Sequence, residues 1–164
     1  MKVITILFFA FFLSVWQSGC AQKEGLFAPD TFENRALAKT RKGEIYNSLE
    51  IKASIVATWL NPLLSEFKNE KNACFLVTVF IDDDFEDPKK QGLNNPDYVL
   101  TLEGKEPVSV KPLSEDDPLV KMAPLKMMWG HNYLACFPDP GSKTMRMRFT
   151  SRRYGVSVLT FSKE

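Results

Sequence analysis

Residues 145–161 read MRMRFTSRRYGVSVLTF, and the spacing of apolar residues in this stretch decides the fold class. Two alternating sets of side chains occupy its first half: Met145, Met147 and Phe149, and Arg146, Arg148 and Thr150. An apolar–polar alternation of period two is typical of a half-buried strand. After a turn at Ser151–Gly155, Val156–Phe161 supplies a second strand, so the sequence predicts a C-terminal β-hairpin.

The same period recurs upstream, in Glu44–Leu60. Its expected inner face comprises Ile45, Leu49, Ile51, Ala53, Ile55, Ala57 and Trp59. This stretch is either one long strand or two strands joined by a bend, and Asn61-Pro62 ends it.

Other apolar stretches complete the set of expected strands. Cys74–Ile81 is a continuous apolar run, which suits a central strand that is covered on both faces. Shorter candidates are Asp97–Leu102, Pro107–Val110 and Asn132–Phe137. About seven short strands without a long helix indicate an all-β, antiparallel β-sandwich of the immunoglobulin-like kind.

Two segments do not follow the strand pattern. Asp30–Lys42 is either a helix, because Asp30 and Glu33 have capping-box spacing, or a first edge strand. Leu119–Trp129 is rich in methionine and is interrupted by Pro124. It is either an irregular crossover packed over one end of the core or an adaptable groove for a partner.

The composition is that of an ordinary globular protein. Of 164 residues, 45% are hydrophobic, 25% are charged and the formal net charge is +1. This near-neutral balance argues against nucleic-acid binding, which usually needs a basic excess. One histidine leaves little basis for a zinc enzyme or a His-based triad, and neither a Gly-x-Ser-x-Gly nor a Ser-x-x-Lys pattern is present. We therefore expect a protein that is not an enzyme and that has no cofactor.

The N-terminus carries an export signal. Lys2 precedes an apolar run from Val3 to Trp16, which is the layout of a secretory signal peptide and is too short to span a bilayer. Ser18-Gly19-Cys20 and the following Ala21 resemble the lipobox of bacterial lipoproteins, although Gln17 stands where that family usually has an aliphatic residue. The alternative is cleavage after Ala21, which would release a soluble protein.

The lipobox resemblance implies that Cys20 becomes the lipidated N-terminus. Acyl chains on this cysteine would hold the protein to a membrane. In lipoproteins of this kind an uncharged residue after the cysteine, here Ala21, implies sorting to the outer membrane. We expect the protein to face the periplasm. The expected organisation is a signal peptide at 1–19, a lipidated tether at 20–30 and a β-sandwich domain at 31–164.

Two cysteines remain in the expected sandwich, Cys74 and Cys136. In an oxidising compartment such a pair is a disulfide candidate. Their separation of 62 residues resembles that of the cysteines linking the facing sheets of an immunoglobulin domain, but Tyr133 lies three residues before Cys136 rather than two. The alternative is two free cysteines packed as small apolar residues.

An acidic loop follows the expected central strand. Its carboxylates include the weak metal candidates Asp82, Asp84, Glu86 and Asp87. Calcium needs several oxygen ligands that converge, and acidic loops at strand ends can supply them. The sequence departs from the EF-hand pattern, so the alternative is a solvated acidic turn.

The C-terminal hairpin carries a basic cluster. Its members are Arg146, Arg148, Arg152 and Arg153. The cluster could face acidic headgroups, the cell wall or an acidic partner, or could pair with the acidic loop. The alternative is a set of charges that protects a sheet edge from aggregation.

The whole chain resembles the small lipoproteins with an immunoglobulin-like sandwich of Campylobacter-type bacteria, a group that supplies no functional residues to carry over. The expected function is a non-catalytic, lipid-anchored envelope protein that binds an envelope protein or the cell wall. The alternative is a periplasmic module that binds a small ligand or a metal through residues 82–87.

Overall fold

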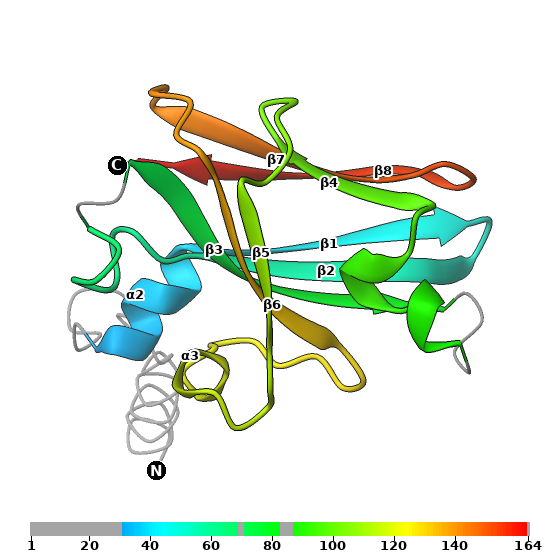
Figure 1. Ribbon diagram of the computed structural model, residues 1–164, viewed down its shortest axis with the longest axis horizontal. Coiled ribbons are helices and arrows are strands. Elements are labelled where there is room, and N and C mark those ends of the chain that lie inside the picture. Colours follow the sequence, from blue (N-terminus) through cyan, green and yellow to red (C-terminus); the bar gives the residue numbers. More distant parts are fainter. Residues whose placement is uncertain (1–30, 69–70, 83–86, 164) are drawn as a thin grey trace, which may run out of the picture.

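The fold is seen in a computed structural model, which describes residues 31–68, 71–82 and 87–163. These residues form eight strands in two antiparallel sheets, an all-β sandwich as predicted (Figure 1). One sheet has the order β1 (Thr40–Asn47), β2 (Glu50–Trp59), β3 (Asn72–Ile81), β6 (His131–Pro138) and β5 (Ser109–Leu113). The other has the order β4 (Tyr98–Leu102), β7 (Thr144–Ser151) and β8 (Gly155–Ser162).

The chain crosses between the sheets three times. After β3 it passes through the short 3-10 helices η1 (Pro88–Lys90) and η2 (Gly92–Asn94) to β4 in the second sheet. It returns for β5, which pairs with β6 rather than with β4, and crosses again to the β7–β8 hairpin. These crossings bring the start of β6 to the side chains around η2.

The core lies between the two sheets. Phe75 of β3 contacts Phe137 of β6 and Phe161 of β8, with ring centroids 6.0 and 5.0 Å apart. All three side chains are buried. The β7–β8 hairpin contributes Met145, Met147 and Phe149 to this core, which confirms the alternation predicted for residues 145–150.

A third layer covers the outer face of the five-stranded sheet. Leu76 and Thr78 of β3 point away from the core cluster and are nevertheless buried. Figure 1 shows α2 (Phe32–Ala38) and α3 (Pro118–Lys121) together on the lower side of the strands. The Thr40 hydroxyl donates to the Ala36 carbonyl of α2 at 2.8 Å. This layer explains why β3 is apolar at nearly every position.

Both predictions for Asp30–Lys42 hold, in different halves of the range. The first half is α2, whose N-cap is Thr31, with its hydroxyl accepting from Asn34 N–H at 3.3 Å. The predicted cap, Asp30, lies outside the described residues. The second half begins β1, which is an edge strand.

Glu44–Leu60 contains two strands rather than one, which raises the number of strands above the expected seven. Ser48 and Leu49 form the turn, and Ser48 has φ 57° while Leu49 has an ordinary φ, as in a II′ hairpin. Leu49, expected on the inner face, is 98% exposed at the turn. Ile51 is 41% exposed, because a bulge opposite Ile45 and Tyr46 interrupts the alternation.

Candidate functional site

A pocket opens where β5 ends and β6 begins. Its volume is about 560 Å³, within the roughly 300–1,000 Å³ that is usual for small-ligand sites. Three stretches distant in sequence line it: Gln91 and Asn94 around η2, residues 112–115 at the end of β5, and residues 129–133 at the start of β6. We call it the β5–β6 pocket.

Two glycines allow the segments around this pocket to approach closely. Gly92 has φ 58°, and a Cβ there would overlap the hydroxyl of Tyr133. That hydroxyl accepts a hydrogen bond from the N–H of Leu93 at 3.2 Å. A Cβ on Gly130 would overlap Thr78, so the turn before β6 rests directly on the outer face of β3. Both side chains that the glycines admit, Tyr133 and Thr78, are buried.

The turn before β6 holds Trp129 in an unusual backbone conformation. Gly130 N–H donates to the Met127 carbonyl at 3.2 Å, which closes a four-residue turn. Trp129, its third residue, has φ 60° while Met128 has an ordinary φ, which is the type II arrangement that favours glycine. A bulky residue in this region is an outlier. Trp129 is also 66% exposed, so burial in the core does not account for its presence.

The β5–β6 pocket mixes polar with apolar surface and carries little charge. Glu115 is the only carboxylate among the described lining residues, and none of them is lysine or arginine. His131, the one histidine of the chain, is the exposed first residue of β6 and also lines the pocket. Burial raises the pKa of Tyr133, and the hydrogen bond from Leu93 N–H offsets part of that rise.

A second pocket, of about 410 Å³, lies on the other side of the same turn. It shares Glu115 and Asn132 with the first. The rest of its lining is mainly apolar, with two lysines and one threonine: Val120, Ala123, Leu125, Met127, Met128, Lys121, Lys126 and Thr78. The methionine-rich segment therefore forms a groove as well as covering the sheet. Thr78 of β3 and Asn132 of β6 both line this second pocket, and the Thr78 hydroxyl donates to Asn132 Oδ1 at 2.7 Å.

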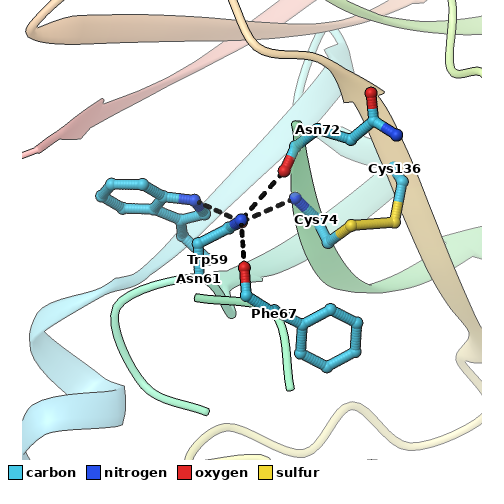
Figure 2. Close-up of a disulfide and its surroundings, with 6 residues drawn as sticks. All are labelled: Trp59, Asn61, Phe67, Asn72, Cys74 and Cys136. Atoms are coloured by element: carbon cyan, nitrogen blue, oxygen red, sulfur yellow. Dashed lines mark hydrogen bonds between the residues drawn. A yellow bond between two sulfur atoms is a disulfide. The ribbon is translucent and has the colours of Figure 1, made fainter. Parts of the chain in front are cut away.

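Cys74 and Cys136 form a disulfide, with their Cα atoms 4.1 Å apart (Figure 2). The comparison with the immunoglobulin bridge is wrong in one respect, because the two cysteines lie opposite each other on neighbouring strands of the same sheet. Cys74 directs its N–H and C=O toward the β2 side, to Asn61 and Leu60. The pair is therefore a non-hydrogen-bonded one, where cross-strand side chains approach most closely.

Asn61 organises the chain beside the disulfide (Figure 2). Its Oδ1 accepts from Trp59 Nε1 at 2.9 Å and from Cys74 N–H at 2.8 Å. Its Nδ2 donates to the carbonyls of Phe67 and Asn72, both at 2.9 Å. One amide thus ties the loop after β2 to the start of β3.

The acidic loop is only partly described. Asp82 pairs with Lys52 at 3.4 Å, and the Asp87 carboxylate accepts from Lys89 N–H at 3.0 Å. Asp84 and Glu86 lie outside the described residues, as does Cys20. Within the parts of the chain that the structure describes, no group of three or more metal-ligating side chains converges. The calcium site stays a prediction, which calorimetric titration of the protein with calcium would test.

The basic cluster is divided by its ion pairs. Two groups of Arg146 donate to the Glu103 carboxylate. The side-chain Nη2 lies 3.3 Å from Oε2, and the backbone N lies 2.7 Å from Oε1. Arg152 and Arg153 both lie beside Asp97, at 3.9 and 3.4 Å. These arginines therefore pair with acids flanking β4. Arg148 lies between Thr101 and the exposed Val158 in the register of the three-stranded sheet.

The sequence patterns missed the β5–β6 pocket. The one available signal was the run Met127-Met128-Trp129-Gly130, which places large apolar side chains next to a turn residue outside any strand period. Chemically, an exposed indole next to amides, an imidazole and one carboxylate suits non-covalent binding. No helix in the described residues is both long and apolar enough for a membrane span. Comparisons with protein-family models, curated proteins and solved structures give no match for this chain.

Proposed function

We propose that this chain is a non-catalytic, lipid-anchored protein of the bacterial envelope that binds another envelope component at the β5–β6 pocket. The observation that carries the proposal is the backbone of Trp129. A left-handed conformation costs a non-glycine residue roughly 1–2 kcal/mol, and this side chain is mostly exposed. Strained residues that folding does not require concentrate at binding sites.

The envelope location is supported by two features of different kinds. The lipobox-like Ser18-Gly19-Cys20 provides the anchor, with residues 20–30 as the tether to α2 and the outer membrane as the destination. The Cys74–Cys136 disulfide is the chemistry of an oxidising compartment such as the periplasm. Labelling cells with a clickable fatty acid tests the anchor. Wild-type protein should carry label and Cys20→Ala should not, and equal label on both would refute lipidation.

Binding without catalysis is proposed from the side chains that line the pocket. Catalysis by a nucleophile needs a base within hydrogen-bond reach of it. Ser114, Glu115 and His131 lie in the same lining, and the described contacts include no side-chain hydrogen bond among them.

The binding function is tested by photo-crosslinking in the cells that make the protein. A photoreactive residue replaces Asn94, which is exposed and lines the pocket, or Val158 on the opposite sheet as a matched control. We expect an envelope adduct from position 94 and none from 158. Equal adducts, or none at either position, would refute the assignment of binding to this pocket.

A further inference from the structure

We infer that the β5–β6 pocket binds an uncharged saccharide, with the indole of Trp129 as the surface on which a sugar ring stacks. The inference rests on the proposed function, in that it takes this pocket as the binding site and names the class of ligand. Three properties of the pocket support it: the exposed aromatic ring, the planar polar groups and the lack of cations.

The aromatic ring matches the apolar face of a sugar. A pyranose presents C–H bonds on its flat faces and hydroxyls around its rim, so it stacks on an aromatic ring and hydrogen-bonds at its edge. Trp129 supplies the largest aromatic surface available, and the turn of residues 127–130 fixes its backbone. Because a tryptophan side chain has only two rotatable bonds, stacking costs little side-chain entropy.

The rest of the lining matches the hydroxyls. Asn94, Glu115 and His131 offer both donors and acceptors within the same pocket. Asn132 is oriented by Thr78, which donates to its Oδ1, and its Nδ2 makes no hydrogen bond with any described residue. An oriented amide nitrogen at the pocket wall is a ready donor for a ligand hydroxyl.

The charge of the lining selects against anions. Phosphate, carboxylate and sulfate ligands are usually held by arginine or lysine. The described lining contains neither residue, and its single formal charge is the carboxylate of Glu115. A polyanionic glycan would meet repulsion there, whereas a neutral sugar would find a hydrogen-bond acceptor.

The test uses the mature lipoprotein in detergent and two neutral probes, the N-acetylglucosamine tetramer and maltotetraose, with tetragalacturonate as the acidic probe. Calorimetry measures affinity, and tryptophan fluorescence reports the site, since Trp59 is buried and Trp129 is exposed. We expect at least one neutral probe to bind and to change the Trp129 emission. Binding only of tetragalacturonate, or of no probe at all, would overturn the inference.

Variants separate stacking from folding. Trp129→Ala should weaken binding by about tenfold or more, and Trp129→Phe should retain most of the affinity, because a phenyl ring still stacks. Tyr46→Ala is the matched control, since it removes an aromatic ring that is 51% exposed on β1, away from the pocket. Wild-type affinity in Trp129→Ala would overturn the role of the indole, and Trp129→Phe excludes misfolding as the cause of a loss.

The adduct formed at position 94 separates the two proposals. An adduct that muramidase or another glycosidase removes supports both the binding function and the saccharide class. An adduct that only protease removes supports binding at this pocket and overturns the saccharide inference.

Discussion

Replacing Trp129 by glycine and by alanine should reverse the usual stability order of these two residues. At most ordinary positions alanine is the more stable by about 0.5–1 kcal/mol. Both replacements remove the same indole contacts, so the comparison isolates the backbone. At φ 60° alanine still has the conformational cost of the left-handed region, roughly 1–2 kcal/mol, and glycine does not. Glycine instead lowers the stability by about 0.4–1 kcal/mol, because its unfolded state has more conformational entropy. The free energy of unfolding of Trp129→Gly should therefore exceed that of Trp129→Ala by about 1 kcal/mol.

The assay is urea unfolding followed by the fluorescence of Trp59, which is buried and remains in both variants. Lys111, exposed on the edge strand β5, is the matched control, and there alanine should be the more stable replacement. If the alanine variant at position 129 is as stable as the glycine variant, or more stable, the strained conformation is refuted. The argument that Trp129 serves binding rather than folding would then lose its basis.

Three further predictions concern stability. Replacing both Cys74 and Cys136 by alanine should lower the free energy of unfolding by about 4 kcal/mol, given the loop that the bridge closes, and reductant should then have no further effect in urea unfolding. Asn61→Ala should lower the stability by about 2–4 kcal/mol, because it removes four hydrogen bonds. Asn61→Asp should lower it more, because a carboxylate oxygen would then face the two carbonyls that now accept from Nδ2. Thermal unfolding at neutral pH would show this order, and equal losses of stability would contradict it. Hydrogen bonds from the Arg146 side chain, and to a smaller extent from its backbone N–H, lower the pKa of Glu103 in the folded state. The carboxylate therefore stabilises the fold at pH values above the unfolded pKa of about 4.3. This stabilisation is lost as the pH falls through the lower pKa of the folded state. The stability advantage of wild type over Glu103→Gln should therefore shrink in acid urea unfolding, and an advantage independent of pH would contradict the pairing.

The strands were largely predictable, because burial on one face imposes a period that the sequence must show. Residues 145–150 display it without interruption, and they lie in β7. The period failed at Leu49 and Ile51, where a turn and a bulge interrupt the alternation. Neither feature changes the polarity pattern, so period alone could not reveal them.

The candidate site was much less predictable. The β5–β6 pocket joins Gln91, Glu115 and Trp129, which are distant in sequence and meet only through the crossings between sheets. The cysteine pairing could be anticipated, but its position within one sheet could not, since spacing along the chain does not specify which strands are neighbours. The basic cluster was visible in the sequence, whereas its partners Glu103 and Asp97 depend on the register of β4 against β7.

The layer outside the five-stranded sheet has a consequence for how this sequence can change over generations. A residue of β3 must fit the sandwich core on one side or the covering layer on the other, so almost none of its positions is free to drift. The outward positions of β7 and β8, such as Arg148 and Val158, meet solvent and tolerate exchange. Diverged copies of this gene should thus retain the segment around Val77 longest and should vary first at those outward positions. Retention of Trp129 in copies that have lost Arg148 would indicate selection for binding rather than for folding.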